Sequence, residues 1–85
     1  GLVNAVSEPG SLMDDALALA ERIMSNSPAG VQLSKRALQA NLEVGSYAAA
    51  LELENRGQVL LSRTEDMPEA LAAFREKRAP IFVGE

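Results

Sequence analysis

"NSPAGVQLSKRALQANLEVGS", residues 26–46, contains the signals that decide the fold. Ser27 is a typical helix N-cap, and Pro28 suits the first helical position because its fixed φ angle matches a helix there. Leucine and alanine then recur at helical spacing until a glycine interrupts the pattern, and Ser46 can cap the next helix. The stretch therefore predicts one helix over residues 28–43, with a helix ending before it and another beginning after it.

The remainder of the chain predicts three more helices, over residues 11–25, 46–63 and 67–78. Ser11 is expected to cap the first of them, after a Pro-Gly turn. Asp66 and Glu69 predict a capping box at the start of the last helix, with Asp66 accepting from first-turn amides and Glu69 reaching back. Pro80 ends this helix, because the residue before a proline is pushed out of the helical region. The helix over 46–63 is apolar on more than one side, which indicates burial against more than one neighbour.

Residues 1–10 differ from the rest, because a mostly apolar segment there leads into a turn at Pro9 and Gly10. We expect a short strand, and a single strand needs a partner for its backbone hydrogen bonds. The chain is therefore expected to begin inside a larger fold. The predicted fold class is all-α, with four helices and a strand-like N-terminal lead-in.

Composition excludes several classes of function. The 85 residues suffice for one small domain, and 47% hydrophobic but only 4% aromatic residues are typical of closely packed helices. Cysteine and histidine are absent, which excludes disulfides, thiolate catalysis and histidine-based triads, and no metal site or cofactor is expected. A net charge of −4 argues against nucleic acid as a partner, and no apolar run is long enough for a membrane span. We expect a soluble, cytoplasmic protein.

Two pairs of neighbouring carboxylates are the remaining candidates for acid–base chemistry: Asp14-Asp15 and Glu65-Asp66. Both pairs stand at predicted helix starts, where the helix dipole favours negative charge and carboxylates cap free amides. Helix formation accounts for them, so we expect no catalytic residue in this chain.

The basic C-terminal end, "AAFREKRAPIFVGE" at residues 72–85, is the one candidate binding region. Phe74 and Lys77 are three residues apart and would share one face of a helix. An aromatic ring beside an ammonium group suits a nucleotide that carries an extra phosphate, since the base stacks on the ring and the lysine meets the phosphate. Alternatively, the cations complement the helix dipole and Phe74 belongs to the core. Spacing alone leaves both interpretations open.

The chain resembles the C-terminal part of the enoyl-CoA hydratase/isomerase (crotonase) family. The resemblance covers essentially the whole chain, and it rests on the order and intervals of several motifs rather than on any single one. These motifs are Gly1-Leu2-Val3-Asn4-x-Val6, Ala18-Leu19-Ala20, Asn26-Ser27-Pro28, Ser34-Lys35-Arg36-Ala37, Arg63-Thr64-Glu65-Asp66 and Ala73-Phe74-x-Glu76-Lys77-Arg78-x-Pro80.

This resemblance implies that the chain is a fragment of a longer parent of the crotonase-type β/α spiral fold, with the catalytic glutamates and the oxyanion hole upstream. Residues 1–10 would then be the lead-in from a missing N-terminal spiral domain, and residues 11–85 a helical region for oligomerisation and CoA capping. The parent would act on acyl-CoA as a trimer or hexamer, as a hydratase (lyase) or isomerase of fatty-acid metabolism. Phe74 and Lys77 would reach the adenosine and the 3′-phosphate of CoA held in a neighbouring subunit.

The fragment alone is expected to be inactive and to self-associate through its apolar surface. A free-standing helical protein-interaction module with no enzyme activity is the alternative. The intact mass of the gene product, or the reading frame upstream of Gly1, distinguishes the two. Within the family, hydratase, isomerase, decarboxylase and dehalogenase activities stay open, because the deciding acid–base residues would lie upstream.

Overall fold

A computed structural model describes residues 1–85 and contains four α-helices and no strand. The helices are α1 (Leu12–Met24), α2 (Pro28–Asn41), α3 (Tyr47–Leu61) and α4 (Asp66–Glu76). All four predicted helices are therefore present, and each begins within one residue of its predicted start. The all-α fold class is confirmed.

Of the three predicted serine N-caps, two are confirmed and one is wrong. The Ser27 hydroxyl accepts from the Gly30 amide at 3.3 Å, and the Ser46 hydroxyl accepts from the Ala49 amide at 3.4 Å. Ser11 makes no such bond, because its backbone is already helical (φ −95°, ψ −5°). A capping side chain needs an extended backbone to reach the first-turn amides, and Ser11 lacks it.

Residues 1–8 run as irregular backbone, so the predicted strand is absent in this chain. No second strand is present to pair with it, and an unpaired strand has no ladder of hydrogen bonds to define it. The predicted turn is present, since the Ser11 amide donates to the Glu8 carbonyl at 3.0 Å and Gly10 takes a left-handed φ of 89°.

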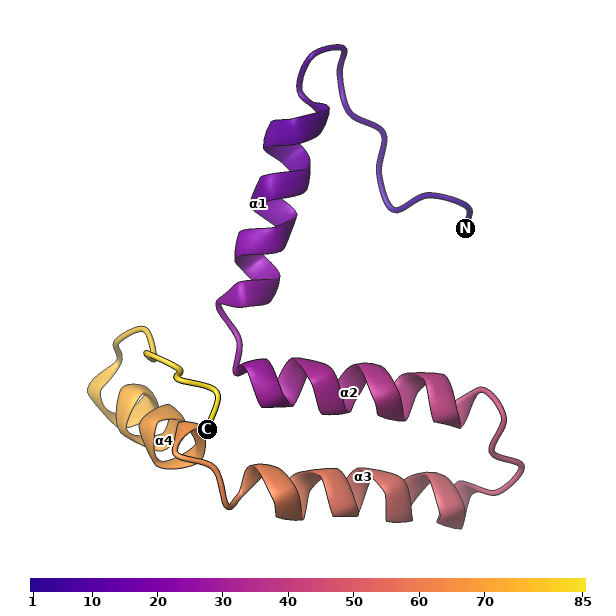
Figure 1. Cartoon of the computed structure of the whole chain (residues 1–85), viewed down its shortest axis with the longest axis vertical. Helices are drawn as coiled ribbons and strands as arrows, with labels where there is room; N and C mark the ends of the chain where they lie inside the picture. Colours follow the sequence, from indigo (N-terminus) through magenta and orange to yellow (C-terminus); the bar gives the residue numbers. More distant parts are fainter.

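The helices form an open, L-shaped arrangement (Figure 1). α2 and α3 lie antiparallel and side by side, α4 follows at the far end of α3, and α1 leads away from this body as a separate arm. The molecule measures 44 × 40 × 20 Å. Its radius of gyration is 16.3 Å, whereas about 12 Å is expected for a compact chain of this length.

The arm meets the body at a short elbow between α1 and α2. The Asn26 side-chain amide donates to the carbonyls of Arg22 at 2.9 Å and Ile23 at 3.2 Å, which closes the C-terminal end of α1. Ser27 then caps α2 immediately. The direction of the arm is therefore set by local hydrogen bonds rather than by a shared core.

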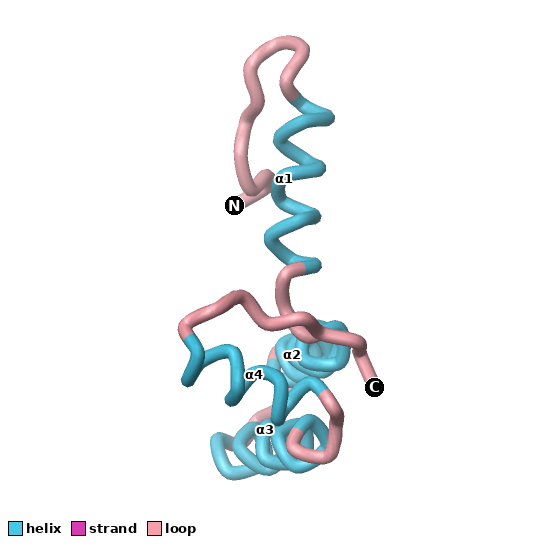
Figure 2. The backbone as a smooth tube through the Cα atoms, turned by 90° about the vertical axis from the view of Figure 1, so that its left-hand side faces the viewer, coloured by secondary structure: helices cyan, strands magenta, loops and turns pink.

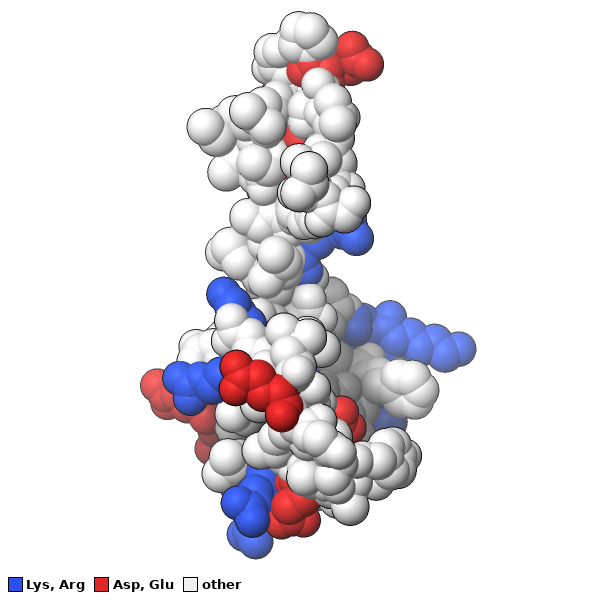
Figure 3. Space-filling model, turned by 90° about the vertical axis from the view of Figure 1, so that its right-hand side faces the viewer, with Lys and Arg blue, Asp and Glu red and all other residues white.

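Burial is confined to a small region near α4. Asp66 and Ala73 are the only buried residues, at 3% and 2% exposure. Large apolar side chains on α1 remain exposed, including Leu17 at 55% and Ile23 at 47%. The face of the arm in Figure 3 is mostly uncharged, while charged side chains gather on the body. None of the four helices combines the length and the apolar composition needed to span a bilayer.

Candidate functional site

The end of α4 is closed by a Schellman motif, the commonest way for a helix to satisfy its last carbonyls. The Arg78 amide donates to the Ala73 carbonyl at 3.1 Å, and the Lys77 amide donates to the Phe74 carbonyl at 3.4 Å. Lys77 adopts φ 53° and ψ 40°, the left-handed conformation that this motif requires. It is the only non-glycine residue in the chain with a positive φ.

This geometry corrects the predicted relation between Phe74 and Lys77. The helix ends at Glu76, one residue before Lys77, so the two side chains do not share a helical face. Glycine is the residue that usually provides the left-handed position, and no glycine in this sequence indicated an end at residue 76. Both side chains are exposed, Phe74 at 83%, so the interpretation of Phe74 as core is wrong within this chain.

Arg78, directly after the left-handed residue, is held by two carboxylates of α4. It forms a forked pair with Glu69, with Nη1 at 2.6 Å from Oε1 and Nη2 at 2.9 Å from Oε2. Its Nε lies 2.6 Å from Oε2 of Glu76. Glu69 also accepts from the Ile81 amide at 2.8 Å. Glu69 and Arg78 therefore fix the chain reversal that follows α4; we call this pair and Glu76 the α4 clamp.

Asp66 joins three segments that are distant in sequence. Its Oδ2 accepts from the Ser27 hydroxyl at 2.7 Å, at the start of α2. Its Oδ1 accepts from the amides of Val83 at 2.8 Å and Gly84 at 3.1 Å. The C-terminal segment 79–85 thus folds back beside α4 toward the start of α2 (Figure 2).

Close packing reinforces this return of the chain. Gly84 has φ 81°, and a Cβ atom placed on it would lie 3.3 Å from Cγ of Pro28. A larger residue would be strained in its backbone and would press against α2. Phe82 is half-buried and lines a small cavity with residues of α2, α3 and α4, among them Leu61 and Met67. The C-terminal segment therefore joins α2, α3 and α4 into one body.

The predicted capping box of Asp66 and Glu69 is wrong. Asp66 is itself the first residue of α4, and Glu65 before it has helical angles, so no side chain caps the first-turn amides. Asp66 and Glu69 bind the C-terminal segment instead. Sequence spacing missed this role, because the same residues fit a local cap and a distant acceptor equally well. The one signal available was Gly84, which permits a close approach of the chain.

The electrostatics of both carboxylates follow from these contacts. Burial by itself would raise the pKa of the Asp66 carboxyl, but hydrogen bonds from Ser27, Gly84 and Val83 together lower it below its usual value. Hydrogen bonds from Arg78, followed by the Ile81 amide, lower the pKa of Glu69 to about 2. The two glutamates in turn raise the pKa of Arg78. Both carboxylates are therefore ionised at neutral pH, which suits binding of the chain rather than proton donation.

Acidification should release the α4 clamp in a defined pH range. Because the pKa of Glu69 is lowered from 4.5 to about 2 by folding, the clamp contributes its full stabilisation above about pH 4.5 and loses it as the pH falls toward 2. The chemical shift of the Ile81 amide proton should report this, with a midpoint near pH 2. A midpoint at the unperturbed value of 4.5 would show that the clamp does not form in solution.

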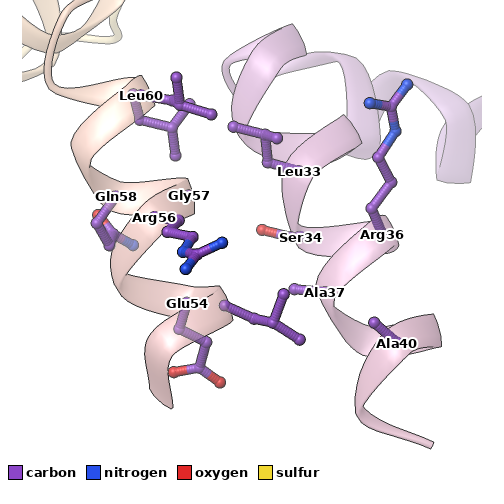
Figure 4. Close-up of a pocket in the computed structure, with 12 residues that line it drawn as sticks. Leu33, Ser34, Arg36, Ala37, Ala40, Glu54, Arg56, Gly57, Gln58 and Leu60 are labelled. Atoms are coloured by element: carbon purple, nitrogen blue, oxygen red, sulfur yellow. The ribbon is translucent and has the colours of Figure 1, made fainter. Parts of the chain in front are cut away.

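The second candidate site is a groove of about 280 Å³ between α2 and α3 (Figure 4). Leu33 and Ala37 of α2 and Leu60 of α3 line it. Arg36 and Arg56 lie among its lining residues, but Arg56 already pairs with Glu52 along α3 at 2.9 Å. Half of the residues that line the groove are hydrophobic, and Ser34, Glu54 and Gln58 are among the polar ones.

Known proteins similar to this chain are enoyl-CoA hydratases. A family model described as enoyl-CoA hydratase/isomerase matches residues 1–85. The short-chain-enoyl-CoA hydratase of Clostridium acetobutylicum is 43% identical over 79 residues, which cover 92% of this chain and 30% of that protein. The 2,3-dehydroadipyl-CoA hydratase of Escherichia coli is 38% identical over 84 residues, covering 99% and 32%.

Solved structures agree with these relatives. The enoyl-CoA hydratase of Bacillus anthracis superposes with a TM-score of 0.92 at 36% identity, covering 100% of this chain and 33% of that one. The enzyme of Mycobacterium tuberculosis gives 0.89 at 34% identity, with the same coverage. This chain spans about 30% of the length of the relatives it matches and corresponds to their C-terminal part. The match over all residues, together with the shared helical fold, shows that the chain belongs to the enoyl-CoA hydratase/isomerase family.

Proposed function

We propose that these helices serve as the C-terminal region of an enzyme that hydrates 2-enoyl-CoA thioesters, where they cover apolar surface of the catalytic part and of neighbouring subunits. "Complete enzyme" here means the polypeptide in which residues 1–85 form that region. Residues 1–10 would then connect to the catalytic spiral, and residues 11–85 would cap the CoA site. The activity of the similar proteins, which are named as hydratases of CoA esters, supports the choice of reaction.

The observation that carries this proposal is the lack of a core. Only Asp66 and Ala73 are buried, although the chain keeps its fold match over its full length. Each large apolar side chain that moves from water into an interface contributes about 1.5–3 kcal/mol, so exposed apolar faces of this extent favour binding to another surface. Without such a surface, we expect copies of the isolated chain to associate with one another.

The isolated chain is also expected not to hydrate a crotonyl thioester. Hydration needs groups that move protons at the double bond. The two carboxylates with perturbed pKa values, Asp66 and Glu69, are ionised and already occupied by hydrogen bonds of the C-terminal segment.

We further propose that Phe74 and Lys77 contact CoA bound in a neighbouring subunit. Both are exposed and lie on either side of the end of α4, on the body of the molecule. The ring would stack on the adenine and the ammonium group would meet the 3′-phosphate.

Lys77→Ala in the complete enzyme should raise KM for crotonyl-CoA about tenfold, as expected for one lost charge-assisted hydrogen bond. KM for crotonyl-3′-dephospho-CoA should not change, because that substrate lacks the phosphate. Steady-state kinetics with both substrates measure this. Lys35→Ala, the only other lysine, which is exposed on α2, is the matched control and should affect neither KM. An equal rise in KM for both substrates would reject the phosphate contact.

A further inference from the structure

Lys77 occupies a backbone position that lysine disfavours. The left-handed conformation brings Cβ of an ordinary residue close to the following carbonyl oxygen, and glycine avoids this. The Schellman bonds at the end of α4 involve only backbone atoms of Lys77, so they would form equally well with glycine there. The lysine side chain is therefore held at a strained position without any contribution to the cap itself.

The residues around Lys77 keep it in this conformation. The backbone amide of Arg78 donates to the Ala73 carbonyl, and its guanidinium group pairs with Glu69 and Glu76. Glu69 is the best placed of the two carboxylates, since its side chain is 24% exposed, compared with 60% for Glu76, and since it also accepts from the Ile81 amide. The chain is thus anchored on both sides of the strained residue.

We propose that Glu69, acting through Arg78, is a positioning residue that sets the direction of Lys77 toward the 3′-phosphate of CoA. This inference rests on the proposed CoA contact of Lys77 and adds two residues to it. Neither Glu69 nor Arg78 touches the ligand. The left-handed backbone turns the Cα–Cβ bond of Lys77 away from the line of the α4 side chains, and the α4 clamp maintains that turn.

Glu69→Gln in the complete enzyme tests this, because glutamine keeps the shape but loses the charge that binds the Arg78 fork. We expect KM for crotonyl-CoA to rise about threefold to fivefold, with kcat and KM for the 3′-dephospho substrate unchanged. Glu52→Gln is the matched control: it breaks the exposed pair with Arg56 on α3, far from the end of α4 in sequence, and should change nothing.

A second variant and a cycle separate positioning from general stability. Arg78→Lys keeps the positive charge but cannot form the forked pair with Glu69. It should therefore raise KM for crotonyl-CoA as Glu69→Gln does and leave KM for the 3′-dephospho substrate unchanged. The double variant Glu69→Gln/Lys77→Ala should have the same KM for crotonyl-CoA as Lys77→Ala alone. The reason is that Glu69→Gln acts on KM only through the ammonium group of Lys77, which the double variant lacks. Amide exchange at Arg78 should accelerate in Glu69→Gln, since its bond to the Ala73 carbonyl loosens.

The outcomes distinguish this inference from the proposed function. If KM rises for crotonyl-CoA alone in Lys77→Ala, but does not rise in Glu69→Gln or Arg78→Lys, the positioning role is overturned and the CoA contact stands. If KM for crotonyl-CoA does not rise selectively in Lys77→Ala, the contact itself is rejected. Equal rises in KM for both substrates in Glu69→Gln and Arg78→Lys would also overturn the positioning role, because they would indicate a purely structural clamp.

Discussion

Replacing Asp66 with alanine is expected to release the C-terminal segment from the body of the molecule. The change removes one carboxylate that accepts from the Ser27 hydroxyl and from the amides of Val83 and Gly84. Asp66 itself is 3% exposed, and the three part-buried hydrogen bonds to it would lose their acceptor, which is unfavourable wherever water cannot replace it. No other single side chain joins so many segments.

Hydrogen exchange measures this release directly. The Val83 and Gly84 amides should exchange at least about tenfold faster in Asp66→Ala, because each loses its only acceptor. Asp15→Ala on the exposed surface of α1 is the matched control and should leave both rates unchanged. Exchange rates in Asp66→Asn should fall between those of Asp66→Ala and Asp15→Ala, because the single side-chain oxygen of asparagine can replace only one of the two carboxylate oxygens as an acceptor. Equal exchange in Asp66→Ala and Asp15→Ala would show that the return of the chain does not depend on this carboxylate.

The second large effect concerns the apolar side of α1. Leu19→Asp in the complete enzyme should prevent assembly, because it loses the burial of a leucine and places an unpaired charge in an apolar contact. Leu19 is 42% exposed in this chain, so the same change should be tolerated when the chain is alone and should reduce its self-association.

Sedimentation of both forms checks this contrast. Ala18→Asp is the matched control, because it adds the same charge between Asp14 and Arg22 on the polar side of α1. The control should assemble like the unmodified enzyme. Normal assembly of the Leu19→Asp enzyme would show that α1 is not covered by another surface, and the proposal for the arm would fail.

Helix positions could be predicted because their signals are local. Pro28 with Ser27, and Ser46 after a glycine, specify where a helix begins whatever surrounds them. The end of α4 could not be predicted as well, because Lys77 takes a backbone conformation that its side chain disfavours. That conformation is maintained by contacts of Arg78 with a residue nine positions earlier, which no local pattern contains.

Roles of side chains were harder to predict than elements. The spacing of Asp66 and Glu69 predicts a helix cap, whereas the structure shows both carboxylates bound to the C-terminal segment, at Val83 and Ile81, which lie 17 and 12 residues away, respectively. Helical spacing predicts that Phe74 and Lys77 share one face of a helix, but α4 ends before Lys77, so they do not; both side chains are exposed. Their contact with CoA stays a prediction, because it depends on a ligand and a neighbouring subunit.

The elbow at Asn26 has a further consequence, for how changes in this molecule combine. Since α1 is joined to the body through one short connection with its own hydrogen bonds, it shares little packing with the residues around Asp66. Free-energy effects at sites without shared neighbours add. The two parts can therefore accumulate substitutions independently, so that relatives can differ in α1 while the contacts around Asp66 stay the same.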